Sequence, residues 1–331
     1  MKKLTLLIVA LILCALASWA QLPAPSFTIW PESSGNFTIY YSTYGAPTGN
    51  VVWVNWGDGI VKGFERNNNG SNPNKGFSGN ATKGTPIKIY SNYLDAIEIY
   101  TRAAAIKCES NNPQLQYIYY LNDNLNSQAL EALYFSLIDR NHKTAWGELH
   151  LSQTTTVADA GNNILQSNAF AALDKKWQVC SMKDYKGNKY WKLDENACKE
   201  NLKPAIRFIT LGSYNISDLQ LGIKPMPGLP FDVPTAFIRI EDGTSNHKSV
   251  SVSNHLTNSD FESNATKLSV NTRIFVDIYG AFVSHVKLNT HKISGVVFSG
   301  PYNLRYLNLN NCSNNDMLLN LFKQLLLEDL Y

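Results

Sequence analysis

The chain has 331 residues, 44% of them hydrophobic, and its 29 Lys and Arg residues against 26 Asp and Glu residues give a formal net charge of +3. This length is enough for two or three domains with substantial cores, and so small a charge argues against a dedicated nucleic-acid-binding protein, which would carry a clustered basic excess. Charged residues are only 17% of the chain, below the usual share of about 25%, and asparagine supplies much of the polar surface.

The first 20 residues have the three parts of a secretory signal peptide. Met1–Lys3 is basic, Leu4–Leu16 is almost wholly apolar, and Ser18–Ala20 places small residues where a signal peptidase cleaves. The apolar run is shorter than the roughly 20 residues that a membrane span needs, and no later stretch is long and apolar enough to cross a bilayer. We therefore expect a secreted, periplasmic or outer-surface protein from which residues 1–20 are removed.

The segments that follow are rich in strand signals. Phe37–Tyr41 and Val51–Trp56 are β-branched and aromatic, and Asp58-Gly59 after the second is a tight-turn signal. The Asn-, Gly- and Ser-rich stretch 67–79 indicates an exposed loop. Ala236–Ile240 followed by Asp242-Gly243 repeats the strand and turn later in the chain. In both turns the Asp side chain is expected to bond its own backbone.

The next segment changes period. Leu94, Ile97 and Ile99 are spaced as in the leucine-rich-repeat pattern LxxLxL, and Leu115, Ile118 and Tyr120 repeat that pattern 21 residues later. This spacing falls within the repeat length of about 20–29 residues. The same pattern recurs from Val283 and again from Leu304, with Cys312 at the following marker position. Later segments are predicted as follows: helix 127–138, strand 147–152 and helix 163–176, which is followed by Trp177–Val179.

The two halves resemble each other, which indicates an internal duplication. Phe77–Lys83 (FSGNATK) matches Phe261–Lys267 (FESNATK), and after a short insertion Leu115–Ile118 matches Leu304–Leu307. Matches on both sides of one insertion are hard to obtain by chance. The second copy ends inside the helix that matches 127–138, so it is shorter than the first.

Four cysteines follow the signal segment: Cys108, Cys180, Cys198 and Cys312. An oxidising compartment permits disulfides, and four cysteines allow three connectivities. Cys180 and Cys198 flank a predicted hairpin with a Gly-Asn turn at 184–190, so they are the candidate disulfide, worth about 3 kcal/mol for a loop of this size. Cys108 and Cys312 are expected to be buried thiols.

Three features together resemble a known class of protein. They are the segment Val54–Gly59 (VNWGDG), the two sets of repeats, and the helix that leads into Lys175–Val179. These resemble secreted leucine-rich-repeat proteins of Bacteroidetes-type bacteria, and VNWGDG is similar to the signature of PKD domains, which are immunoglobulin-like sandwiches. The resemblance implies a β-rich α+β fold, secretion and a binding role, and it carries no catalytic residues.

The predicted organisation is a tandem duplication of a PKD- or immunoglobulin-like β-sandwich followed by a short, degenerate leucine-rich-repeat segment. The boundaries are these: 1–20 signal peptide, 21–93 first sandwich, 94–180 first repeat segment, 181–204 linker or hairpin, 205–282 second sandwich, and 283–331 second, shortened repeat segment.

No catalytic, metal or cofactor motif is present in the sequence. There is no GxSxG, HExxH, phosphate loop, CxxC or EF-hand loop. The Asn-rich loop 67–74 is short of the carboxylates that calcium prefers. Glu148 with Asp58 is the acid pair that a hydrolase would use if the fold brought them together.

In a leucine-rich repeat the positions between the apolar ones face solvent, and here they include Tyr and Arg, which are typical binding anchors. The candidate ligand-binding residues are Glu98, Tyr100, Tyr117, Tyr119, Lys287, Asn289, Arg305, Asn308 and Asn310. We expect a non-enzymatic binding or adhesion protein that contacts protein or glycan at the cell surface, with no nucleic-acid partner. A secreted hydrolase with an unrecognised site and a structural envelope component remain as alternatives.

Overall fold

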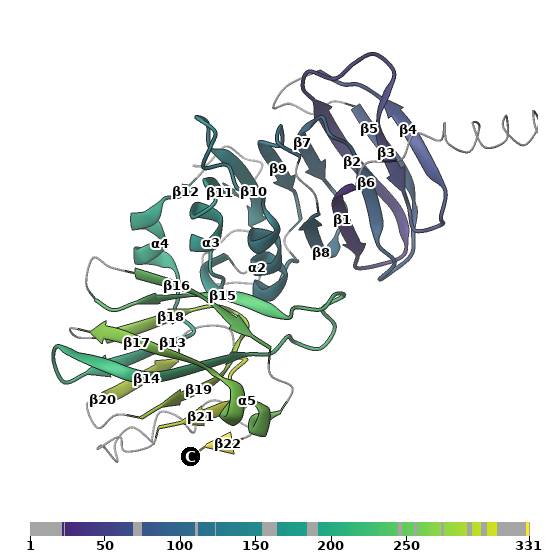
Figure 1. Cartoon of the computed structure of the whole chain (residues 1–331). Coiled ribbons are helices and arrows are strands. Elements are labelled where there is room, and N and C mark those ends of the chain that lie inside the picture. The colour runs from purple at the N-terminus through teal and green to yellow at the C-terminus, as the bar shows by residue number, and fades with distance from the viewer. Residues whose placement is uncertain are drawn as a thin grey trace, which may run out of the picture.

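The computed structural model describes residues 22, 24–68, 75–109, 112–122, 124–153, 164–183, 191–243, 247–254, 257–272, 275–289, 293–298, 303–309 and 329–330. The signal segment, the 184–190 turn, Asn310 and Cys312 lie outside these residues. Within them the chain is β-rich, with several sheets packed face to face and a few short helices (Figure 1).

The first unit contains two sheets. Sheet A has the order β4-β3-β6-β1-β8, and sheet B has the order β12-β11-β10-β9-β7-β2-β5. Their strands are β1 (Pro25–Pro31), β2 (Gly35–Thr43), β3 (Asn50–Asn55), β4 (Val61–Glu65), β5 (Lys75–Ala81), β6 (Ile87–Tyr90), β7 (Leu94–Ile99), β8 (Ala103–Cys108), β9 (Tyr117–Tyr120), β10 (Gly147–Gln153), β11 (Trp177–Lys183) and β12 (Trp191–Leu193).

Alternating apolar residues of the two sheets form the first core. Val52 and Val54 of β3 and Ile39 of β2 are fully buried, as the period of two in a half-buried strand requires. Trp56 packs against Phe77 in an edge-on arrangement with the ring centroids 5.9 Å apart. The tryptophan of the VNWGDG segment is therefore part of this core.

One half of sheet B is parallel. β7, β9, β10 and β11 pair in that order, all parallel, and Ile97 pairs with Ile118. Parallel neighbours need a crossover connection. Strand β8 forms the crossover between β7 and β9, and helices form the crossovers between the later strands. These helices are α2 (Ser127–Ser136) and α3 (Phe170–Leu173), and the short 3₁₀ helix η1 (Ile164–Gln166) precedes α3. α4 (Glu195–Asn201) follows β12.

The second unit also contains two sheets. Sheet C has the order β16-β15-β18-β13-β20, and sheet D has the order β17-β14-β19-β21-β22. Their elements are β13 (Ile206–Thr210), β14 (Tyr214–Ile223), β15 (Thr235–Glu241), β16 (His247–Ser253), α5 (Asn258–Asn264), β17 (Thr266–Thr272), β18 (Phe275–Tyr279), β19 (Val283–Leu288), β20 (Ile293–Phe298), β21 (Tyr306–Asn308) and β22 (Asp329–Leu330).

The two units have corresponding strand orders. In sheet A, β3 lies between β4 and β6, and in sheet C, β15 lies between β16 and β18. Val54 of β3 pairs with Ile89 of β6, and Ile240 of β15 pairs with Ile278 of β18. The parallel pairs correspond as well, because β19 lies beside β21 as β7 lies beside β9.

Several predicted elements are present and others differ. The strands predicted at 37–41, 51–56, 147–152 and 236–240 and the helix at 127–138 are found, with shifted ends. The helix predicted at 163–176 is instead the short η1 and α3. The loop predicted at 67–79 ends earlier, because Lys75–Ala81 pairs with β2 and buries Phe77. Sheet B also crosses the expected boundary at residue 93, since β7 pairs directly with β2.

The matching heptapeptides have different structures. FSGNATK lies in strand β5 and its next turn, whereas FESNATK lies in helix α5 and the start of β17. Thr257 caps α5 by accepting a hydrogen bond from the Asp260 N–H at 3.1 Å. The first copy has Gly76 and Gly79 where the second has Asp260 and Ser263, and glycine disfavours a helix interior.

The helices of the first unit lie between sheet B and sheet C (Figure 1). Phe135 of α2 contacts Phe237 of β15, with ring centroids 5.6 Å apart, and Phe170 of α3 contacts Tyr279 of β18 at 5.3 Å. Arg239 of β15 is buried, with its guanidinium 3.8 Å from the centroid of the Phe170 ring. The two units therefore share an interface of packed aromatic rings that also buries the Arg239 side chain.

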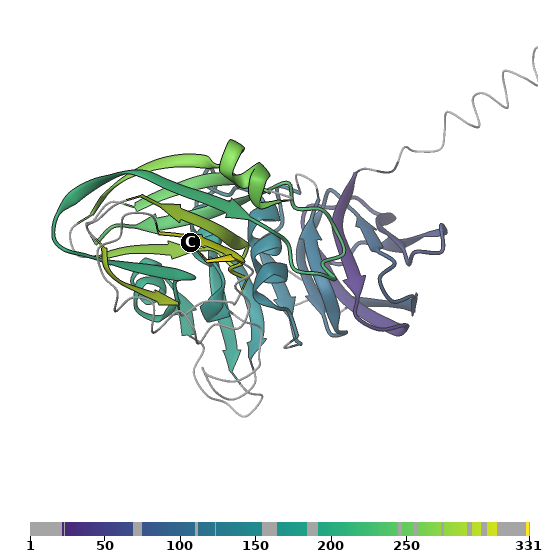
Figure 2. The ribbon, with the colours of Figure 1, turned by 90° about the horizontal axis from the view of Figure 1, so that it is seen from below.

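The view from below shows α5 as the light green helix on the outer side of the second unit (Figure 2).

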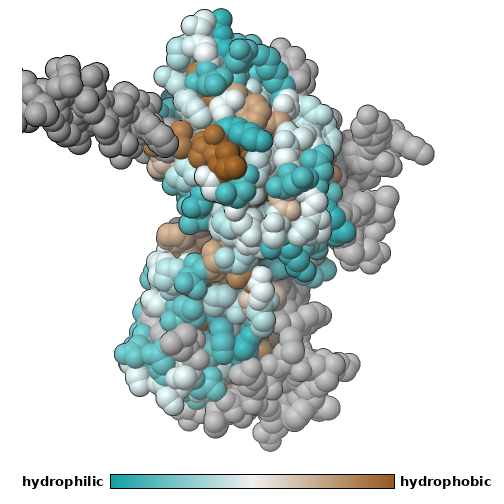
Figure 3. Space-filling view, turned by 90° about the vertical axis from the view of Figure 1, so that its right-hand side faces the viewer, coloured by the Kyte–Doolittle hydropathy of each residue, from teal (hydrophilic) through white to brown (hydrophobic). Residues whose placement is uncertain are grey.

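The surface at the sheet A end is mostly hydrophilic, with one compact apolar patch (Figure 3). In the described part of the chain, no helix combines the length and hydropathy needed to cross a bilayer.

Candidate functional site

One row of residues runs across sheet B on the face opposite the helices. Strand register places six side chains side by side in this row, in the order Tyr40, Glu98, Tyr119, His150, Cys180 and Lys192. Tyr117 and Glu148 lie in the adjacent row, where they pair with each other, and Tyr100 follows the end of β7. We call these nine residues the tyrosine face.

The alternation of each strand explains why these side chains share a face. Ile118 and Tyr120 of β9 point into the core and are fully buried, so Tyr117 and Tyr119 point the other way. The same alternation applies to β10, where Leu149 and Leu151 are buried in the core.

The aromatic rings of the tyrosine face form two contacting groups. Tyr119 stacks on Tyr117 with ring centroids 6.3 Å apart and on His150 at 4.6 Å. Tyr40 meets Tyr100 edge-on at 5.3 Å. Tyr100 is 50% exposed, and Tyr117 and Tyr119 are half-buried. The face thus presents large rings whose orientation is fixed by their neighbours.

Charged groups lie beside these rings. Glu148 accepts a hydrogen bond from His150 Nε2 on Oε2 at 2.9 Å and one from Lys192 Nζ on Oε1 at 3.0 Å. Burial alone would raise the pKa of Glu148, but these hydrogen bonds and charges outweigh it, so its pKa lies below the usual value. Burial lowers the pKa of His150, and burial raises the pKa of Glu98. At neutral pH Glu148 is therefore a carboxylate beside a neutral imidazole.

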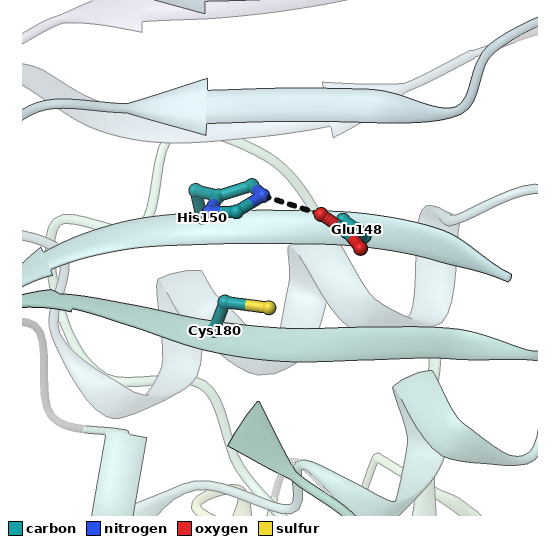
Figure 4. A group of neighbouring side chains, drawn as sticks. All are labelled: Glu148, His150 and Cys180. Atoms are coloured by element: carbon teal, nitrogen blue, oxygen red, sulfur yellow. Dashed lines mark hydrogen bonds and ion pairs between the residues drawn. The ribbon is translucent and has the colours of Figure 1, made fainter. Parts of the chain in front are cut away.

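Cys180 is the third polar group of the His150 and Glu148 cluster. Figure 4 shows Glu148 and His150 extending from β10 and Cys180 from the neighbouring β11. Donor atoms of the three side chains all lie within 4.8 Å of one another. Burial raises the pKa of the Cys180 thiol to about 11, so the free thiol is protonated at neutral pH and is a poor nucleophile.

The expected Cys180–Cys198 disulfide is not formed. Both are buried free thiols, as is Cys108. Val179 and Cys198 belong to the core on the helix side of sheet B, whereas Cys180, next to Val179 in β11, points to the opposite face. The sheet therefore separates the two sulfur atoms.

Lys287 and Asn308, two of the residues predicted in the second unit, pair with each other on the corresponding face of sheet D, but α5 covers this face. Phe261 of α5 is fully buried, with its ring 5.2 Å from His285 and 5.3 Å from Tyr306. Glu262 forms an ion pair with Lys287 and accepts a hydrogen bond from the Tyr306 hydroxyl.

The covering helix corrects the expectation that the second unit presents an exposed binding surface. Asn308 is 6% exposed and Lys287 is half-buried in its ion pair. Asn289 is exposed, Arg305 is half-buried, and Asn310 lies outside the described residues. Tyr306 and Asn308 occupy the sheet positions of Tyr117 and Tyr119, which remain partly exposed in the first unit.

The acid pair considered for hydrolysis is not assembled. Asp58 lies in the β3–β4 turn of sheet A, where its Oδ1 accepts a hydrogen bond from the Ile60 N–H at 2.9 Å, as the turn interpretation requires. Glu148 lies on sheet B and its partners are His150 and Lys192. At the other turn, Gly243 has a φ of 75°, which favours glycine.

Sequence reasoning found the tyrosines but missed Tyr40, Glu148, His150, Cys180 and Lys192 as members of the same face. The alternation of strand 147–152 already points Glu148 and His150 away from Leu149 and Leu151. Their position beside Tyr119 depends on the parallel pairing of β9 with β10, which joins distant segments. No protein-family model, curated protein or solved structure matches the chain.

Proposed function

We propose that this chain is a secreted or cell-surface, non-enzymatic binding protein whose tyrosine face contacts a protein or glycan ligand. The observation that carries the proposal is the stack of Tyr117, Tyr119 and His150 on paired strands, in which both tyrosine rings are partly exposed. Tyrosine offers a large contact area at a low cost in conformational entropy, and such residues dominate binding energy in many interfaces.

The polar groups of the face suit the same role. Glu98 and Glu148 offer carboxylate acceptors beside the rings, and Lys192 adds an exposed donor. Rings combined with acceptors and donors fit a ligand that has both apolar surface and hydroxyl or amide groups. Both a peptide and a sugar chain have that chemistry.

The proposed origin is a tandem duplication of a sandwich with leucine-rich-repeat-like parallel strands, as in the secreted Bacteroidetes-type proteins that the sequence resembles. The corresponding strand orders of the two units support it. In this view the first unit binds ligand. The second has lost that role, because α5 occupies the equivalent face and satisfies Lys287, Tyr306 and Asn308.

The test is a double variant, Tyr117→Ala with Tyr119→Ala, compared with wild type for binding to glycan arrays and to cell-surface protein. Loss of two anchor residues should weaken binding by roughly 30-fold or more, since a hot-spot residue contributes at least about 2 kcal/mol. The matched control is Tyr44→Ala, because Tyr44 is 66% exposed and lies in the turn after β2, outside the tyrosine face.

If the double variant alone loses binding to a glycan, the ligand is a sugar. If the double variant alone loses binding to a cell-surface protein, the ligand is a protein. If wild type binds neither class, or if Tyr44→Ala weakens binding as much as the double variant, the tyrosine face is not a ligand site.

A further inference from the structure

The cluster of Glu148, His150 and Cys180 has a geometry that ligand binding by the tyrosines does not require. Glu148 and His150 are two residues apart on β10 and therefore project from the same face, and Cys180 lies directly opposite His150 in the parallel pair β10–β11. Figure 4 shows the three side chains on one side of these two strands. One oxygen, one nitrogen and one sulfur donor thus lie within 4.8 Å of one another.

We propose that Glu148, His150 and Cys180 form a binding site for a divalent transition-metal ion of the zinc class. Zn²⁺ takes Cys sulfur at about 2.3 Å, His nitrogen at about 2.0–2.1 Å and carboxylate oxygen at about 2.0–2.2 Å. In a tetrahedral site these bond lengths put donors roughly 3.3–3.6 Å apart, so small side-chain rotations assemble the set.

The ion takes the place of the proton that now joins His150 Nε2 to Glu148 Oε2, and the neutral imidazole carries its single proton on Nδ1 instead, so that the Nε2 lone pair binds the metal. Nε2 and Oε2 are 2.9 Å apart, so they must separate slightly to admit a metal. When the sulfur–metal bond forms, the Cys180 thiol gives up its proton to solvent, and the thiolate is the ligand. Three protein ligands leave a fourth position for water or a ligand group.

Neighbouring residues support the three ligands. Tyr119 stacks on the His150 ring at 4.6 Å and so fixes its plane. Lys192 holds only Oε1 of Glu148, at 3.0 Å, and Oε2 is the oxygen that faces His150. Contacts that orient ligands in this way strengthen metal sites.

The donor set selects the class of metal. Thiolate and imidazole favour zinc and related transition ions, whereas Ca²⁺ and Mg²⁺ require oxygen ligands. A second group of suitable side chains, Glu195, Glu241 and His247, differs in an important respect. Its two carboxylates already form ion pairs with the guanidinium of Arg239, so their negative charge is neutralised without a metal ion.

Calorimetric titration of the full chain with Zn²⁺ tests the proposal. We expect one equivalent to bind to wild type, and Cys180→Ser to lower the affinity by about 100-fold or more, since even changes outside the ligands cost about 10–100-fold. Cys198→Ser is the matched control, because Cys198 is an equally buried free thiol on the helix side of the sheet. It should bind Zn²⁺ as wild type does.

Titration of wild type with Co²⁺ gives a second readout, which needs no variant and so does not depend on whether a variant folds. Bound Co²⁺ should show a sulfur-to-metal charge-transfer absorption, and Zn²⁺ should remove it. The proposal is wrong if wild type binds neither ion, if bound Co²⁺ lacks that absorption, or if folded Cys180→Ser binds Zn²⁺ as tightly as wild type. Metal binding does not require the proposed ligand function, so either can fail without the other.

Discussion

A buried carboxyl group lies between the two units, and its burial should make the stability of the folded chain depend on pH. Glu131 of α2 is fully buried, and its Oε1 accepts hydrogen bonds from the backbone N–H of Asn168 at 2.7 Å and of Ala281 at 2.6 Å. Asn168 precedes α3 in the first unit, and Ala281 lies between β18 and β19 in the second. Burial raises the pKa of Glu131 from 4.5 to about 8, although these hydrogen bonds oppose the shift.

The sign of the effect follows from this shift. Because the folded pKa lies above the unfolded value, the contribution to stability is complete below pH 4.5 and is lost as the pH rises through about 8. Between those values the unfolded chain releases the proton and the folded chain keeps it. The free energy of unfolding should therefore fall by about 1.4 kcal/mol per pH unit, or about 3 kcal/mol between roughly pH 5.5 and 7.5.

Glu131→Gln isolates this contribution. The glutamine keeps a carbonyl oxygen for both N–H groups and cannot ionise. Urea unfolding of wild type and variant is measured at three pH values across that range. At each pH the free energy of unfolding of wild type is subtracted from that of the variant, which removes the contribution of groups that titrate in both proteins. The difference should change by about 3 kcal/mol, with the variant gaining relative to wild type as the pH rises.

The exposed carboxyl of Glu200 supplies the control, since Glu200→Gln should leave the pH dependence of wild type unchanged. If Glu131→Gln and wild type show parallel pH profiles, Glu131 does not hold its proton at the interface, and the reasoning from burial fails.

Two further substitutions test packing and charge. Gly79→Ala should lower the free energy of unfolding by about 1–3 kcal/mol in thermal or urea unfolding, because its Cβ would lie 2.4 Å from the Trp56 ring; Ser78→Ala on the same strand should have little effect. Arg239→Ala should cost about 3–5 kcal/mol, since it leaves the buried carboxylate of Glu241 without its cation. A smaller loss in Arg239→Ala than in Ser78→Ala would contradict that assignment.

The sequence alone was sufficient where local signals decide structure. Alternating apolar residues located strands such as Phe37–Tyr41, and helical spacing located α2. Residues that occupy the same position of the 21-residue pattern lie side by side in parallel strands, Ile97 beside Ile118 and Val286 beside Leu307. In each case the spacing of the apolar residues within one strand or helix indicates which of its sides is buried. This spacing can be read from residues that are close together in the sequence.

Local context also explains why similar segments differ. FSGNATK and FESNATK share five residues, yet Gly76 and Gly79 favour the strand in the first, whereas Thr257 and Asp260 start a helix in the second. Sequence similarity predicted one structure for both. The helix then covers the second face, so the difference determines which face remains accessible.

The composition of the site depended on tertiary structure. Tyr119 of β9, His150 of β10 and Cys180 of β11 come from segments separated by whole helices, and only the pairing of their strands puts them in one row. The alternation of β11 places Cys180 on the opposite side of the sheet from Val179 and Cys198, which belong to the core. A single sequence records the direction in which each side chain points, but the partner that it meets is fixed by long-range strand pairing and by the packing of α5.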